Sequence, residues 1–283
     1  MPSSLKPELP FLKNASTALF INGNSWCWRG SFLNCSASLG FDLSSTLEWR
    51  LLIPIRDPVS NIIQDVWNLC TLASRMDWFR DIAIQDNWCD RHPFQWSLYT
   101  GLDIQQFHVE LRSILDYAAT ILVKLADKPE QVRGNDSFEK LSQWSEAEPS
   151  AENKLGNQVS AVIRSGCWYK NIRQIRDNIV HYGANAFVFG EPTKGILFQV
   201  SKHFINQINI RELMWNENVV DFELYAGLYF ARLLELLEKL GNLISGRIPP
   251  NYVTSGVEAN YDGLDVYANW INRLIEKIQA DVL

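Results

Sequence analysis

The chain has 283 residues, of which 47% are hydrophobic and 20% are charged, and its net charge is −6. These fractions are typical of a folded globular protein, no apolar run is long enough to span a bilayer, and the acidic total argues against nucleic-acid binding through overall charge. Five cysteines without regular spacing favour a reducing compartment over a disulfide framework. The first residues do not resemble a signal peptide, so we expect a cytoplasmic protein without a membrane partner.

The N-terminal third predicts one long helix between less regular segments. Residues 1–56 contain short apolar runs among Ser, Asn and Gly, which is typical of short strands or extended segments, with a proline-rich arm at the start. Asp57 followed by Pro58 predicts a helix start, and this helix should reach about Arg80. Residues 81–101 are rich in Trp and Phe without helical periodicity, which indicates a connection packed by aromatic rings.

Asp103 is expected to cap the clearest helix of the first half, in which apolar residues recur at helical spacing. Arg112 and Asp116 lie one turn apart on this helix and are expected to pair. The polar residues 128–153 then predict a flexible loop that contains one short helix at residues 137–144.

The second half predicts further helices and one hairpin. Residues 154–183 predict a short helix, a break at Ser165-Gly166 and a second helix. Residues 186–200 contain two short apolar runs around a turn with Pro and Gly, which predicts a β-hairpin that acts as a flap beside the preceding helix. Residues 221–243 carry apolar side chains on two sides, which indicates deep burial or a partner helix, and residues 265–283 predict a final amphipathic helix.

The segment from Lys170 to Gly183 concentrates polar residues that suit chemistry. Three isoleucines recur in it at helical spacing, so one face should be buried. Asp177 and His181 share a helix face, and Arg176 flanks it. Arg176 and His181 are separated by roughly 140° around the helix, so they converge only on something that lies across it. A substrate or a second copy of the chain would meet this requirement.

The run from Arg176 to His181 resembles the Arg-x4–6-His signature of HEPN domains, all-helical modules of which many are ribonucleases. Four residues separate the arginine from the histidine, and a polar residue, Asp177, directly follows the arginine, as the family prefers. A long amphipathic helix lies on either side in the sequence. The resemblance covers roughly residues 103–246.

Long helices, short loops and one small hairpin predict a mainly α bundle, which matches the HEPN architecture. We therefore expect a mainly α fold, a HEPN-like helical bundle with one small β-hairpin and an N-terminal extension. The expected parts are an N-terminal extension or subdomain of unknown role (residues 1–102), a HEPN-like helical domain (residues 103–250) and a C-terminal amphipathic helix (residues 251–283).

The resemblance implies a metal-independent endoribonuclease that needs no cofactor. Such a reaction requires a base for the 2′-OH, an acid for the leaving 5′ oxygen, and positive charge for the phosphorane. His181 suits the base or the acid because imidazole titrates near neutrality, and a helix C-terminus favours its protonated form. Arg176 offers a fork of donors shaped for a phosphate. Asp177 is expected to orient the ring of His181 and to set its tautomer.

Four further residues are expected to bind the substrate. Asn178 and Tyr182 would add hydrogen bonds, and Lys170 and Arg173 belong to a strip in which every charged residue from position 153 to position 176 is basic. Such a strip binds phosphates even in an acidic protein. A solvated helix face explains the same charges equally well.

One chain supplies one such histidine, so the resemblance implies a homodimer with a composite site that cuts RNA to 2′,3′-cyclic phosphate and 5′-OH ends. The implied setting is a toxin or defence effector with an antitoxin or defence-system partner. Some HEPN toxins carry a tyrosine two residues after the histidine, which a partner antitoxin modifies. Here that position is Gly183 and the tyrosine is adjacent, at Tyr182, so a modifying antitoxin does not carry over.

Two alternative functions stay open at this stage. A non-catalytic HEPN module would bind RNA, a nucleotide or a protein partner through the same cleft. A helical interaction protein would use Arg176 and Asp177 in surface ion pairs and His181 as a satisfied histidine near a helix end. Cys89 and His92 have metal-like spacing, but no second close pair accompanies them, so we expect no metal site.

The remaining polar and aromatic residues are expected to play structural roles. We expect His108 at the surface or edge of its helix and His203 in a solvated loop. The tryptophans from Trp26 to Trp96 are expected mostly in the core or at an interface, with a base-stacking platform as the alternative. No P-loop, dinucleotide-binding glycine motif or nucleophile elbow is present, which argues against nucleotide-triphosphate enzymes.

Overall fold

The computed structural model describes residues 4–40, 49–85, 91–133, 137–173, 175, 187–189, 191–199, 208 and 210–280. The fold is mainly α, as predicted. The α-helices with defined bounds are α1 (Leu9–Thr17), α2 (Ser31–Ser38), α3 (Trp49–Gln85), α5 (Pro93–Leu125), α6 (Phe138–Ala147), α7 (Ala151–Leu155), α8 (Asn157–Ser165), α11 (Phe222–Ser245) and α12 (Leu264–Ala280). The strands are β1 (Leu19–Asn22), β2 (Ser25–Arg29), β3 (Phe187–Phe189), β4 (Leu197–Gln199), β5 (Met214–Asn216), β6 (Val219–Asp221) and β7 (Glu258–Ala259).

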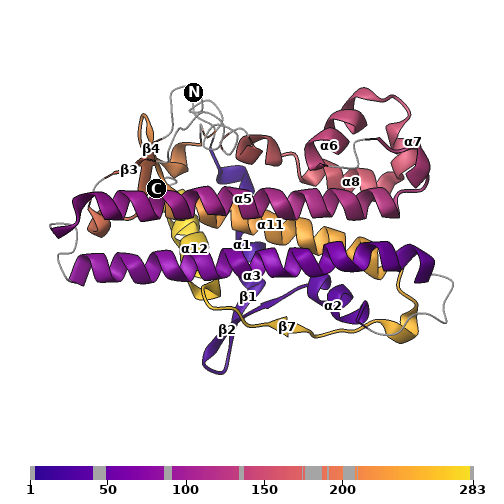
Figure 1. Cartoon of the computed structure of the whole chain (residues 1–283), viewed down its shortest axis with the longest axis horizontal. Coiled ribbons are helices and arrows are strands. Elements are labelled where there is room, and N and C mark those ends of the chain that lie inside the picture. The colour runs from indigo at the N-terminus through magenta and orange to yellow at the C-terminus, as the bar shows by residue number, and fades with distance from the viewer. Residues whose placement is uncertain are drawn as a thin grey trace.

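Helices α3 and α5 lie side by side as an antiparallel pair along the length of the molecule (Figure 1). Arg75 of α3 pairs with Asp103 of α5, and Asn68 Nδ2 donates to Glu110 Oε2 over 3.3 Å, so residue numbers rise on one helix as they fall on the other. Asp103 therefore holds two helices together instead of capping one, which corrects the predicted helix start.

Both helices begin earlier than the sequence patterns predicted. Helix α3 starts at Trp49, and Pro58 lies inside it because the fully buried Leu52 and Ile55 extend its apolar face toward the N-terminus. Helix α5 starts at Pro93, and the buried Trp96 belongs to its core face, so most of the predicted aromatic connection is helix. In both cases, burial of apolar side chains outweighs a local signal that favours a helix end.

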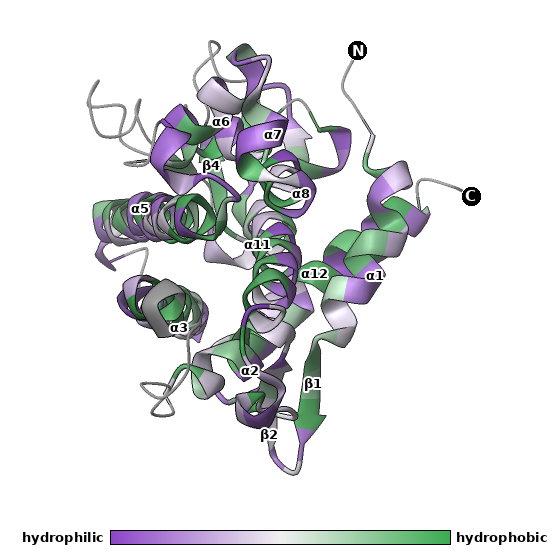
Figure 2. Ribbon diagram, turned by 90° about the vertical axis from the view of Figure 1, so that its right-hand side faces the viewer, coloured by the Kyte–Doolittle hydropathy of each residue, from purple (hydrophilic) through white to green (hydrophobic). Residues whose placement is uncertain are grey.

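Helix α11 is the central element of the fold. Figure 2 shows it between the α3–α5 pair and the helices α12 and α1. Its buried residues point to all sides, which confirms the predicted deep burial. Asp221 caps its first turn by accepting hydrogen bonds from the backbone N–H groups of Glu223 and Leu224, over 3.1 and 3.3 Å. Gly241 permits a close approach, because an added Cβ would collide with the backbone of Ser31 and Phe32 in α2.

The N-terminal segment is folded and packed onto the rest of the chain. The proline-rich arm continues into α1, and the buried Glu212 accepts hydrogen bonds from Ser4 Oγ over 2.6 Å and from the backbone N–H of Leu5 over 3.1 Å. Strands β1 and β2 form a hairpin that pairs with β7 from the C-terminal part of the chain. The expected boundary between residues 102 and 103 falls inside α5.

The predicted hairpin at residues 186–200 is confirmed as β3 and β4, which pair antiparallel with Val188 opposite Phe198. It belongs to a four-stranded sheet in the order β3-β4-β6-β5. Strands β5 and β6 were not predicted, because three-residue strands carry little periodicity. β6 leads directly into α11, so the sheet is fixed to the central helix.

The predicted flexible loop at residues 128–153 contains more order than expected. Ser137 caps α6, where its side chain accepts from the backbone N–H of Lys140, and this confirms the predicted short helix. Helix α7 follows at Ala151 and was missed. Phe138 and Leu141 are buried in the common hydrophobic core, which explains why a polar segment folds onto the bundle.

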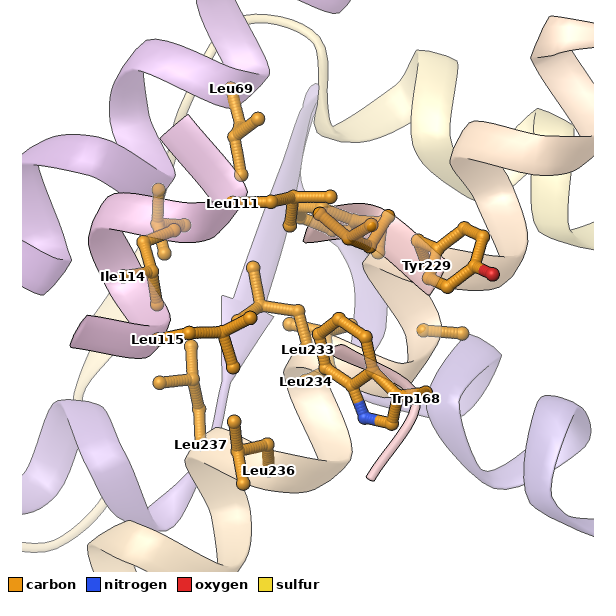
Figure 3. Packing of buried hydrophobic residues seen from close by; sticks show 14 of the residues in the cluster. Leu69, Leu111, Ile114, Leu115, Trp168, Tyr229, Leu233, Leu234, Leu236 and Leu237 are labelled. Atoms are coloured by element: carbon orange, nitrogen blue, oxygen red, sulfur yellow. The ribbon is translucent and has the colours of Figure 1, made fainter. Parts of the chain in front are cut away.

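One hydrophobic core contains buried residues from Leu5 to Ile278. Figure 3 shows a part in which α3, α5 and α11 meet, with Leu69, Leu111, Ile114 and Leu237 among its members. Within the described ranges, no helix combines the length and the apolar character that a bilayer-spanning segment needs. Among the described tryptophans, Trp28 and Trp96 are buried, whereas Trp67 and Trp78 are exposed.

Candidate functional site

The predicted site residues Arg176, Asp177, Asn178, His181 and Tyr182 lie outside the described residues. The described parts on either side are the helical residues 169–173 and 175 before them, and strand β3 after them. In the sequence, the candidate site therefore lies between this helical stretch and β3.

The helix that leads into the candidate site is anchored in the core. It follows a turn at Gly166, which confirms the predicted break, and an added Cβ there would collide with the ring of Phe138. The ring of Trp168 lies 5.8 Å from that of Tyr229 (Figure 3), and Ile172 and Ile175 are buried as predicted. The described helical residues before the motif are thus held against α11 through Trp168 and Asn171.

The described cations of the basic strip are engaged in ion pairs. Their partners are glutamates of α6, α7 and the turn between them: Lys154 pairs with Glu148 at 3.4 Å, Arg164 with Glu152 at 3.6 Å, Lys170 with Glu146 at 2.9 Å, and Arg173 with Glu139. The acidic segment before the strip therefore folds back and neutralises it. Sequence order alone did not indicate this pairing, because the acidic and basic residues occupy separate runs.

A buried polar network extends from this helix into the core. Asn171 Nδ2 lies 3.4 Å from the hydroxyl of Tyr229, whose ring centroid is 4.6 Å from that of Tyr225. The Tyr225 hydroxyl lies 2.8 Å from His108 Nε2, and His108 Nδ1 lies 2.7 Å from the carbonyl oxygen of Ile104. His108 is fully buried, so the prediction of a surface or edge residue was wrong. Its partner Tyr225 is distant in sequence, so no local pattern could have identified it.

The contacts of His108 determine its tautomer and its charge. The Ile104 carbonyl can only accept a hydrogen bond, so Nδ1 carries the proton, and Nε2 accepts from the Tyr225 hydroxyl. Burial lowers the pKa of His108 to about 4. The imidazole is therefore neutral at physiological pH and is a structural group in the core.

Acidification is expected to destabilise the protein through His108. Its pKa of about 4 in the folded state lies below the value of 6.5 for a free side chain, so the unfolded chain takes up the proton first. Stability should fall as the pH drops from about 6.5 to 4, by about 3 kcal/mol from this group. Urea unfolding at several pH values would measure this slope. His108→Gln should flatten this slope, because it removes the buried group that takes up the proton. Equal slopes for the wild type and His108→Gln would contradict the assignment.

A second charged cluster supports the sheet at the start of α11. Glu223 is fully buried, and its two carboxylate oxygens pair with Arg80 at 2.5 Å and with Arg273. Asp221 lies 3.7 Å from Arg273. Burial raises the pKa of Asp221, while Arg273 opposes that change. An added Cβ on Gly195, in the turn between β3 and β4, would lie 3.6 Å from Glu223 Oε1, so this cluster lies directly beneath the hairpin.

A surface pocket of about 790 Å³ lies among α1, β1, β2, α2 and α11. Its charged groups have partners: Lys239 pairs with Glu235 at 2.8 Å, Arg29 pairs with Glu258, and Glu238 accepts from the backbone N–H of Ser31 over 2.7 Å. Its lining contains no histidine or cysteine among the described residues. The described lining of this pocket therefore contains no group that we assign to catalysis.

Among the described residues, no three His, Cys, Asp or Glu side chains are arranged to hold a metal ion. Cys27, Cys35 and Cys70 are buried as free thiols. Of the pair with metal-like spacing, His92 is exposed before α5 and Cys89 lies outside the described residues. His203 also lies outside them.

The chain was compared with models of protein families, with curated proteins and with solved structures, and none of them matches it. The HEPN resemblance therefore depends on the residues between Arg176 and His181 and on the helices around them.

Proposed function

We propose that this protein is a metal-independent endoribonuclease of the HEPN type. The observation that carries the proposal is the Arg176-x4-His181 sequence, which in the chain directly follows described helical residues whose preceding turn packs against α11 through Trp168. A rigid helix entering the motif suits chemistry, because catalytic groups must be held close to their productive geometry. The mainly helical fold agrees with this family.

The proposed reaction uses two copies of His181. One imidazole takes the proton of the ribose 2′-OH, and the 2′ oxygen then attacks the adjacent phosphorus. The bond from phosphorus to the 5′ oxygen breaks, and the second imidazole, in its protonated form, gives a proton to that oxygen. Arg176 stabilises the charge of the phosphorane, and Asp177 orients the imidazole. The products are a 2′,3′-cyclic phosphate and a 5′-OH.

Binding of the RNA phosphate is assigned to Arg176, with hydrogen bonds from Asn178 and Tyr182. Lys170 and Arg173 are instead assigned to holding α6 against this helix, because each already pairs with a glutamate of α6. A phosphate would have to displace those carboxylates before either cation could bind it. The proposed setting is a toxin or defence effector, restrained by a partner in the same cell.

One observation favours a second candidate, a non-catalytic HEPN module that binds a nucleotide or a protein. The glutamates that neutralise Lys154, Arg164, Lys170 and Arg173 reduce the positive potential on the approach to the motif. A nuclease gains binding energy from such potential, whereas a protein-binding module does not require it.

The test is RNA cleavage in excess chelator, followed by analysis of the product ends. The wild type should produce 2′,3′-cyclic phosphate and 5′-OH ends. The double variant Arg176→Ala/His181→Ala, purified in the same way, should produce none and thereby exclude a contaminating nuclease. Absence of cleavage by the wild type on structured and unstructured RNAs would reject the nuclease and favour the binding module.

A further inference from the structure

The N-terminal half of α5 is apolar on its outer side as well as on its core side. Phe94, Leu98 and Leu102 are exposed by 84%, 56% and 51%, and Val109 is exposed by 38%. On a helical wheel these four residues fall within about 80°, directly opposite the buried Phe107. We call them the α5 outer face. A helix that is apolar all round is normally covered by another element.

The α5 outer face has no cover from the described helices, although the rest of the same side of α5 does. Toward the C-terminus of α5, α6 packs over Arg112 and Asp116, and the backbone N–H of Phe138 donates to Asp116 Oδ1 over 3.0 Å. Figure 2 places α5 at the edge of the molecule, on the side away from α12 and α1. One side of α5 is therefore covered by α6 toward the C-terminus of the helix and uncovered toward its N-terminus.

The α5 outer face is also electrically neutral. The charged residue in this stretch, Asp103, is 7% exposed and pairs with Arg75 of α3. His108 is fully buried, and burial lowers its pKa to about 4. In a two-fold contact each patch meets its own copy, so exposed charges of one sign would repel. A neutral face avoids that cost and is self-complementary.

The spacing of the α5 outer face suits helix–helix packing. Phe94, Leu98 and Leu102 follow one another at four-residue intervals, which makes a ridge along the helix, and the face as a whole extends over about 22 Å. Two such ridges interdigitate at a crossing angle of about −50°. The exposed apolar side chains, with the adjacent Tyr99, present roughly 500 Å². This area suits the apolar centre of a standard interface, which buries about 800 Å² per partner including its polar rim.

We propose that the α5 outer face is the two-fold interface between two copies of this chain, with Leu102 of each copy near the axis. This inference rests on the proposed function, whose chemistry requires a second histidine. It also has a structural link to the candidate site, because Ser97 Oγ of α5 donates to the carbonyl oxygen of Val188 in β3 over 3.0 Å. β3 begins six residues after His181, so the helix that forms the interface also holds the strand that follows the site.

The test is the oligomeric state of the full chain, measured by sedimentation velocity at micromolar concentrations. The wild type should be a dimer. Leu102→Glu should be a monomer, because two carboxylates would meet near the axis, and Leu98→Glu should weaken the dimer in the same way. Val253→Glu, at another exposed apolar position, should remain a dimer. Melting temperatures would verify that each variant is folded.

Two results would overturn the inference: a wild type that is monomeric at these concentrations, or a folded Leu102→Glu that dimerises as the wild type does. RNA cleavage measured on the same samples separates this inference from the proposed function. Cleavage by a monomeric wild type would reject both the interface and the two-histidine reaction, and would keep only the assignment of ribonuclease activity. A dimer that depends on Leu102 but does not cut RNA would keep the interface and reject the nuclease.

Discussion

Replacement of His181 by alanine is expected to lower the rate of RNA cleavage by about 10²- to 10⁴-fold, the usual contribution of general acid–base catalysis. The effect should lie toward the upper end of this range, because one substitution in a homodimer removes both the base and the acid. Single-turnover cleavage at saturating enzyme would measure the chemical step directly.

The pH dependence of the RNA cleavage rate tests the same site in a second way. One neutral and one protonated imidazole predict a bell-shaped profile for the wild type, and His181→Ala should lose that shape. Arg176→Lys should retain more activity than Arg176→Ala, because a lysine keeps the charge but not the planar fork of donors. His92→Ala is the matched control, since it removes an exposed histidine elsewhere. Wild-type rates in His181→Ala would place the reaction at another site.

Replacement of Glu223 by alanine is expected to lower the free energy of unfolding by about 3–4 kcal/mol. The carboxylate is fully buried and is shared by Arg80 and Arg273 at the first turn of α11. Its removal leaves two guanidinium groups without their common counter-ion, at a helix N-terminus that itself favours negative charge. Glu223→Gln should cost less, because an amide of the same size retains a hydrogen-bond acceptor. Urea unfolding would measure both differences.

The matched control lies on the same helix. Glu235 pairs with Lys239 at 2.8 Å, but the two side chains are 40% and 41% exposed, so Glu235→Ala should cost less than about 1 kcal/mol. An equal loss of stability in Glu223→Ala and Glu235→Ala would mean that burial adds nothing to the Glu223 cluster. A larger loss in Glu223→Ala would establish it as the support beneath the β3–β4 hairpin.

The amino-acid sequence by itself determined the features that depend on neighbours along the chain. Helical periodicity identified α11, α12 and the core of α5, and the turn residues around Pro192 identified the β3–β4 hairpin. The short helix that begins next to Ser137 was predicted for the same reason. The predicted Arg112–Asp116 pair, at 3.6 Å, also joins residues one turn apart. The assignment of Arg176 and His181 is likewise a sequence prediction, and RNA cleavage is its test.

Tertiary structure decided the features that depend on partners distant in sequence. His108 is a core residue because Tyr225 comes to meet it, and Glu223 is stable when buried because Arg80 and Arg273 converge on it from two other helices. The early start of α3 depends on the burial of Leu52, which no local pattern reveals. Periodicity states which face of an element is apolar, whereas the element that covers that face is selected by the packing of the whole chain.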